Sequence, residues 1–178
     1  MAVGQPESAP PPSPRRRYPA PFLIGTITIP VLILDQLSKL FVKAHMTIDE
    51  TIPLVRHYLD ITYVQNPGAA FSIFVDSAPW VRSALLIALS AAAIIVLAIL
   101  LARAERVSPM TVAYTLILAG AIGNLIDRVA RGRVIDFIRA HYYGWNYPVF
   151  NVADSAITIG VALIVIASVF GGEADRRG

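Results

Sequence analysis

The sequence has no cysteine, and its three histidines, His45, His57 and His141, are scattered along the 178 residues. Without cysteine there is no disulfide bond, no thiolate metal site and no cysteine nucleophile. The histidine spacing matches no zinc motif, so the sequence predicts no metal site. Chemistry carried out by this chain must use other side chains.

Charged residues are also few. They make up 15% of the chain, against 56% hydrophobic residues and a mean hydropathy of +0.61, whereas a soluble domain carries about 25% charged residues. The composition predicts a polytopic membrane protein with room for about four spans of roughly 20 residues. The net charge of +3 comes mostly from arginines in loops and ends. It indicates membrane topology, and we expect no nucleic-acid partner.

Four apolar segments are predicted to cross the membrane, at about 22–42, 81–101, 110–127 and 152–170. They form one domain, 22–172, between two expected cytoplasmic tails. The first tail, 1–21, is rich in proline and arginine and is expected to be disordered, and the second is 173–178. The last two spans carry small residues four apart, which favours close packing between them. These are Ala119 with Gly123, and Ala156 with Gly160.

Residues 43–79 are too polar to cross a bilayer. Two runs rich in β-branched and aromatic residues, 58–65 and 69–75, flank the turn sequence Asn66-Pro67-Gly68. They predict a small sheet, too short to fold alone, that packs on the spans at the membrane surface. Because three arginines precede the first span and the span count is even, both termini are expected in the cytoplasm. The stretch 127–154 then lies at the outer face.

That stretch carries three of the chain's eight aspartates, Asp127, Asp136 and Asp154, each against apolar neighbours. An ionisable side chain at membrane depth costs roughly 2.5 to 3.5 kcal/mol, so such residues are functional candidates. Asp136 lies in an apolar run that we interpret as a re-entrant segment, where burial would raise its pKa. An acid of raised pKa beside one held ionised by a helix N-terminus could share a proton with it and activate water.

Structural roles are open for the same acids. Asn151 and Asp154 have the spacing of an N-cap and its N3 partner in a capping box. Asp127 follows Asn124 by three residues, near the C-terminal end of its helix, where the dipole disfavours an acid, so an ion pair with Arg128 or Arg131 is an alternative role.

Asp35 and Lys39 share one helix face, four residues apart. They could form a salt bridge at the membrane surface or a brace beneath an active site. The sequence does not decide between these two.

Five segments in order resemble the signature segments of lipoprotein signal peptidase, or signal peptidase II. They are DQLSK at 35–39, NPGAAFS at 66–72, GNLIDR at 123–128, VIDF at 134–137 and FNVADSAI at 150–157. The resemblance implies an all-α membrane protein of four transmembrane helices with a small extracytoplasmic β-cradle, at about 43–79. It also implies an aspartic endopeptidase that removes the signal peptide of diacylglyceryl-modified prolipoproteins just before the lipidated cysteine. One departure is Pro67, where threonine is more usual in the family.

The family's catalytic pair falls on Asp136 and Asp154. Matched positions that bind substrate or support the site are Asp35, Lys39, Asn66, Gly68, Asn124, Asp127, Arg128 and Asn151. The resemblance implies no metal and no organic cofactor. The expected partners are prolipoproteins and membrane lipid, and the expected state is a monomer in the bacterial inner membrane, with its active site near the outer face.

Two other classes of function are open to the same residues. Buried acids could form the relay of a small proton-coupled transporter or channel, or they could only pair with arginines in a scaffold protein. The acids gather at one membrane face and no inverted repeat is visible between the halves, which argues against transport.

Overall fold

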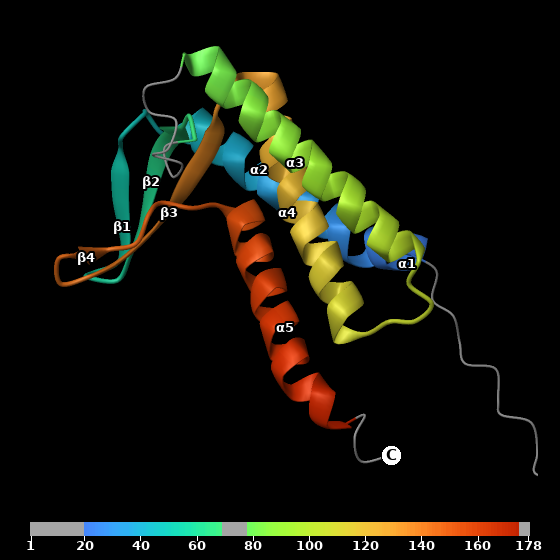
Figure 1. Ribbon diagram of the computed structural model, residues 1–178. Coiled ribbons are helices and arrows are strands. Elements are labelled where there is room, and N and C mark those ends of the chain that lie inside the picture. Colours follow the sequence, from blue (N-terminus) through green and yellow to red (C-terminus); the bar gives the residue numbers. More distant parts are fainter. Residues whose placement is uncertain (1–19, 69–77, 175–178) are drawn as a thin grey trace, which may run out of the picture.

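The computed structural model describes residues 20–68 and 78–174 as helices beside a small sheet (Figure 1). The helices are α1 Ala20–Leu23, the π-helix η1 Ile24–Thr28, α2 Ile29–His45, α3 Pro79–Ala102, α4 Pro109–Arg131 and α5 Val152–Ala174. The strands are β1 Thr51–Val55, β2 Leu59–Asn66, β3 Val134–Tyr142 and β4 Trp145–Asn146. The predicted tail before residue 20 and the predicted strand at 69–75 lie outside the described residues.

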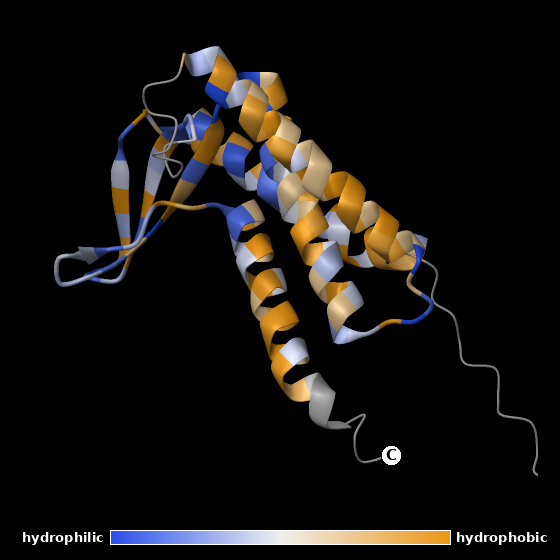
Figure 2. Cartoon of the chain, in the orientation of Figure 1, coloured by the Kyte–Doolittle hydropathy of each residue, from blue (hydrophilic) through white to orange (hydrophobic). Residues whose placement is uncertain are grey.

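Within residues 20–68 and 78–174, four helical segments are long and apolar enough to cross a membrane, as predicted. They are Ala20–His45, Pro79–Ala102, Pro109–Arg131 and Val152–Phe170. Half of the most apolar window of the third segment is buried inside the protein, against 17% in each of the others. Helix α4 is therefore the central helix, and the others turn apolar surface outward, where lipid would cover it. Hydrophobic residues follow the helices along most of their length, and the hydrophilic residues concentrate at the end that carries the sheet (Figure 2).

Helices α4 and α5 are in close contact, as the small-residue spacing predicted. A Cβ atom added to Gly120 would lie 2.3 Å from the backbone oxygen of Ala153, and one added to Gly160 would lie 2.8 Å from that of Ala113. Side chains larger than glycine would push the two backbones apart at both points. This packing brings the polar end of α4 against the first turn of α5.

The sheet is antiparallel, in the order β1-β2-β3-β4. The prediction of a strand at 58–65 is confirmed by β2, but the partners of β2 are β1 and β3, and β3 comes from far along the chain. Asp136 lies on β3, so its placement in a re-entrant segment was wrong. The first four residues of β3 are all buried, and a strand covered on both faces lacks the alternating pattern that marks a strand in a sequence.

The two faces of the β2–β3 pair have different partners, because successive side chains in a strand point to opposite faces. On one face, Tyr63, Ile135 and Phe137 form a buried apolar cluster with Val42 of α2. Asp136 lies on the other face, toward the first turn of α5. The sheet is thus attached to the spans by one face and offers a carboxylate on the other.

Candidate active site

Asp136 is almost fully buried on β3, with 2% of its surface exposed. Each of its carboxylate oxygens accepts a hydrogen bond from an amide, from Asn66 Nδ2 at 2.8 Å and from Asn151 Nδ2 at 2.7 Å. Burial raises the pKa of Asp136 to about 6. The hydrogen bond from Asn66 opposes this rise in pKa, while the negative charge of Asp154 adds to it. The predicted direction of this shift is thus present, although the segment is a strand.

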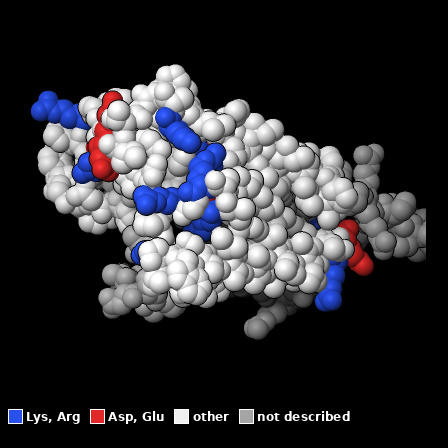
Figure 3. All heavy atoms as spheres, turned by 90° about the horizontal axis from the view of Figure 1, so that it is seen from above, with Lys and Arg blue, Asp and Glu red and all other residues white. Residues whose placement is uncertain are grey.

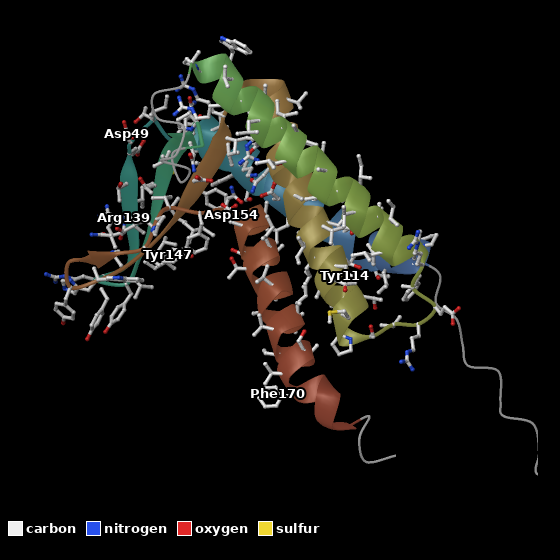
Figure 4. The ribbon with its side chains drawn as sticks, in the orientation of Figure 1. Asp49, Tyr114, Arg139, Tyr147, Asp154 and Phe170 are labelled. Carbon is white, nitrogen blue, oxygen red and sulfur yellow. The ribbon has the colours of Figure 1, made fainter. Side chains whose placement is uncertain are left out.

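Asp154 lies in the first turn of α5, where this helix meets α4 and the sheet (Figure 4). Its Oδ1 accepts from Asn124 Nδ2 at 2.7 Å, and its Oδ2 accepts from the backbone nitrogen of Asn151 at 3.2 Å. In return, Asn151 Oδ1 accepts from the backbone nitrogen of Asp154 at 2.9 Å. The predicted capping box is therefore present, and it holds the Asp154 carboxylate in place at the helix N-terminus.

Asn151 contacts both candidate catalytic acids. Its Nδ2 donates to Asp136, and its backbone nitrogen donates to Asp154. The same Nδ2 lies 3.2 Å from Asn124 Oδ1 and 3.3 Å from the backbone oxygen of Ile135. Asn151 is fully buried, so one side chain ties the strand of Asp136 to the helix of Asp154.

Gly68 fixes the orientation of the Asn66 amide. Its backbone nitrogen donates to Asn66 Oδ1 at 2.8 Å, which leaves Asn66 Nδ2 to donate to Asp136. Gly68 has a φ of +94°, a conformation that favours glycine. The NPG turn therefore acts on the site through Asn66.

A buried ion cluster lies beneath the two acids. Lys39 Nζ lies 2.8 Å from Asp35 Oδ2 and 2.9 Å from Asp127 Oδ2, and all three side chains are fully buried. Lys39 also donates to Asn124 Oδ1 at 3.3 Å. Of the two roles considered for Asp35 and Lys39, the salt bridge at the membrane surface is wrong and the buried brace is present.

Each acid of this cluster also binds the backbone next to a candidate catalytic residue. Asp127 Oδ2 accepts from the nitrogen of Ile135, at 3.3 Å, and Ile135 precedes Asp136. Asp35 Oδ1 accepts from the nitrogen of Ala153, at 2.9 Å, and Ala153 precedes Asp154. The cluster thus positions both the strand and the helix that carry the pair.

Arg131 pairs with Asp127 through Nη1, and the other candidate partner, Arg128, does not. Helix α4 continues one turn beyond the predicted span and ends at Gly132, which has a φ of +71°. This extra turn places Arg131 four residues after Asp127 on the same helix face. The cluster therefore contains two acids, Asp35 and Asp127, and two cations that pair with them, Lys39 and Arg131.

Arg128 extends between two helices. Its Nη1 lies 3.4 Å from the backbone oxygen of Asn124 and 3.5 Å from Ser90 Oγ of α3. Sequence reasoning missed Ser90 and also Gln36, whose Nε2 donates to Asp35 at 3.0 Å and lies 3.4 Å from Asp127 Oδ1. The position of Gln36 inside the DQLSK segment was the available signal, whereas Ser90 lies in an apolar span with none.

An apolar cavity of about 410 Å³ opens beside Asp154. Its aromatic wall comes from the chain between β3 and α5, and Figure 4 shows Tyr147 of this wall on the sheet side of Asp154. The lining residues are Ala140, Trp145, Tyr147, Phe150, Asp154, Ser155, Thr158 and Ile159. The cavity provides space for an apolar group next to one of the two carboxylates.

In the described part of the chain, four helices long and apolar enough to cross a membrane stand beside two carboxylates that contact the same buried asparagine, an arrangement typical of an integral membrane enzyme. A sequence model of the family described as "Signal peptidase (SPase) II" matches residues 27–170. The chain belongs to the signal peptidase II family. The family resemblance predicted from the five segments is confirmed, and it places this chain among the multi-pass bacterial membrane peptidases of lipoprotein processing.

Individual relatives agree over most of the chain. Proteins named lipoprotein signal peptidase are 40% identical in Chromobacterium violaceum, over 86% of this chain and 93% of the relative, and 41% identical in Pseudomonas aeruginosa, over 79% and 83%. Two solved structures, both titled as a bacterial membrane enzyme by the in meso method, have TM-scores of 0.75 and 0.76. They are 36% and 35% identical and cover 86% of this chain, and 90% and 96% of their own. None of these findings supports the alternative of a transporter.

Proposed function

We propose that this chain is an aspartic endopeptidase that removes the signal peptide from diacylglyceryl-modified prolipoproteins, just before the lipidated cysteine. The observation that carries the proposal is the contact of Asn151 with both Asp136 and Asp154. It holds two carboxylates together at one end of the spans, where a substrate anchored in the membrane can reach them. The relatives are named lipoprotein signal peptidase, and this name supports prolipoproteins as the substrate class.

The two acids take different roles in this mechanism. Asp136 is assigned the proton, because burial raises its pKa to about 6 and so favours its protonated form. Asp154 is assigned the role of base, because it accepts two hydrogen bonds at a helix N-terminus, where negative charge is favoured. The ionised Asp154 removes a proton from water as the water oxygen attacks the scissile carbonyl carbon. Asp136 gives its proton to the carbonyl oxygen.

The second half of the reaction returns these protons. The tetrahedral intermediate re-forms its carbonyl as the C–N bond breaks. Asp154 gives the proton taken from water to the leaving amine, and Asp136 recovers the proton it gave to the oxygen. Every proton transfer uses only the carboxyl pair, so the mechanism needs no metal or organic cofactor.

Substrate binding uses the apolar surface around the pair. The cavity beside Asp154 takes an apolar group of the substrate, and the outward faces of the spans contact its lipid chains and signal helix. Asn66, which is oriented by Gly68, donates a hydrogen bond to Asp136 from the side of the sheet. Arg128 of α4, which contacts Ser90 of α3, contributes to the site from the side of these two helices. We further propose that the protein works as a monomer in the inner membrane, with both termini cytoplasmic and the pair near the outer face.

Cleavage of a diacylglyceryl-modified prolipoprotein by the purified full-length protein tests this function. Asp136→Asn and Asp154→Asn each remove a titrating group at nearly constant size, so each alone is expected to abolish turnover while substrate binding remains. Because the two act as a unit, the double variant is expected to be no worse than either single one.

Asp127→Asn is the matched comparison for these variants. Asp127 binds the backbone before Asp136 and contacts no other part of the pair, so its loss should lower activity or folded yield and leave residual cleavage. If Asp136→Asn kept substantial cleavage while a well-folded Asp127→Asn was inactive, Asp136 would not be the second catalytic acid. Cleavage of unlipidated substrate at an equal rate would reject the substrate class.

A further inference from the structure

A second pocket, of about 260 Å³, lies on the face of the sheet that is turned away from Asp136. Three cations surround it, and Tyr63, Gln65 and Ile135 form its sheet wall. Gln65 of β2 pairs with Ile135 of β3, and the neighbouring pair is that of Val64 with Asp136. Because adjacent residues of a strand point to opposite faces, this pocket and the catalytic pair lie on opposite sides of the sheet. The three cations are Lys43, Arg131 and Arg133.

The charge of this pocket is not balanced by acids. Among the described residues, only one of these three cations forms an ion pair, which is Arg131 with Asp127. Lys43 and Arg131 lie in the last turns of α2 and α4, where cations are favoured by the helix dipole. Arg133 lies beyond the end of α4, so the dipole does not explain it.

Tyr63 adds a hydroxyl to the same wall. Its side chain is 4% exposed, and its oxygen accepts a hydrogen bond from Gln65 Nε2 at 2.9 Å. No described residue accepts the hydrogen of this hydroxyl. A lysine, two arginines and a tyrosine hydroxyl are all donors, a set that suits the oxygens of a phosphate group.

The pocket also lies at the ends of two apolar helices, where lipid headgroups are expected. Helices α2 and α4 both end beside it, and the end of an apolar span marks the boundary of the hydrocarbon layer. From above, basic side chains gather near the middle of the surface, and the acidic groups lie toward its edges (Figure 3). Anionic headgroups attract basic residues at this boundary.

We propose that the pocket formed by Lys43, Arg131, Arg133 and Tyr63 binds the phosphate group of a membrane phospholipid. The pocket lies on the opposite face of the sheet from the catalytic pair, and Arg131 is the residue that it shares with the buried ion cluster beneath that pair. The phosphate oxygens accept hydrogen bonds from Lys43 and Arg133, which form no ion pair with a described acid, and from the Tyr63 hydroxyl. A free phosphate ion has the same oxygens, so the source of the phosphate is decided by experiment.

Lipid retention by the full-length protein in detergent, measured by native mass spectrometry, tests the proposal. The probes are phosphatidylglycerol, diacylglycerol with the same chains, and inorganic phosphate. We expect retention of phosphatidylglycerol over diacylglycerol, and roughly 25-fold weaker binding in Lys43→Gln/Arg133→Gln, since each basic residue near an anionic headgroup contributes about fivefold. Tyr63→Phe removes only the hydroxyl and should weaken binding severalfold.

The control removes two cations elsewhere. Arg56→Gln/Arg103→Gln takes away the same charge from exposed positions outside the pocket and should retain phosphatidylglycerol like the unchanged protein. Equal loss in both double variants, or equal retention of diacylglycerol, would overturn the proposal. Binding of inorganic phosphate with no retention of phosphatidylglycerol would reject the lipid as the source.

Discussion

Lys39 and Asp127 lie 88 residues apart in the sequence and form a 2.9 Å ion pair from which solvent is fully excluded. Lys39 is the only cation bound to both Asp35 and Asp127 among the described residues. Removal of one partner from a buried ion pair leaves a charge without compensation. The stability of the fold around the two candidate catalytic acids therefore depends on this lysine.

Lys39→Met is expected to destabilise the protein by about 3 to 5 kcal/mol, because two buried carboxylates lose their shared cation. The measurement is thermal unfolding of the purified protein in detergent. Arg56→Met is the control, since Arg56 is exposed and lies outside both the buried cluster and the phosphate pocket. Similar unfolding temperatures for both variants would contradict a structural role of the buried cluster.

The pH dependence of cleavage should report the proton on Asp136. Because its pKa is about 6 and its protonated form is the proposed acid, kcat/KM is expected to fall as the pH rises through about 6. Asn66 lowers this pKa by its hydrogen bond, so Asn66→Ala should move the fall to higher pH. Gln65→Ala, one residue away on the other face of β2, should leave the midpoint where it is. If the midpoint were unchanged in Asn66→Ala, the ionisation seen in the pH profile would not be that of Asp136.

Arg128→Lys is expected to fold and to lose at least about tenfold in kcat/KM. Its contacts with Asn124 and Ser90 both use Nη1, so the other N–H groups of the guanidinium can donate in its plane to a carboxylate or a substrate carbonyl, which a lysine ammonium does not reproduce. Folded yield and cleavage rate are measured together. Turnover close to that of the unchanged protein would remove Arg128 from the site.

The proposed membrane orientation rests on the arginine triplet before the first span and on an even number of spans among the described residues. Reporter fusions at Gly4, Arg106 and Arg177 are expected to be cytoplasmic, and fusions at Asp76 and Tyr143 external. The fusion at Arg106 is the most informative, because it lies between the second and third spans. An external signal there would reverse the proposed sidedness of the active site.

Local sequence patterns predicted the features that depend on neighbours in the chain. Hydropathy predicted the four spans, residue spacing predicted the capping box of Asn151 and Asp154, and small residues predicted the contact of α4 with α5. Each of these depends on contacts within one helix or on the face that one helix presents. The periodicity of the sequence and the types of side chain were therefore enough to predict them.

Features that join distant segments were not predictable in this way. No local pattern indicates that Lys39 shares Asp127 with Arg131, or that β2 pairs with β3. The strand around Asp136 was missed because its first residues are buried on both faces, although its β-branched and aromatic residues between Gly132 and Gly144 offered a signal. The motifs identified the residues, and only the fold shows that Asn151 brings them together.

Helix α5 supplies the residues that complete the candidate active site, so the site forms late in the synthesis of the chain. Asp154 and Asn151 belong to the final helix and its cap, and Asp35 of the first helix binds the backbone of Ala153. A nascent chain with only three helices inserted therefore has neither the second carboxylate nor the asparagine that holds the pair. On the proposed mechanism, peptide hydrolysis therefore starts only after the fourth helix has joined the other three, so a chain with three inserted helices cannot cut other membrane proteins.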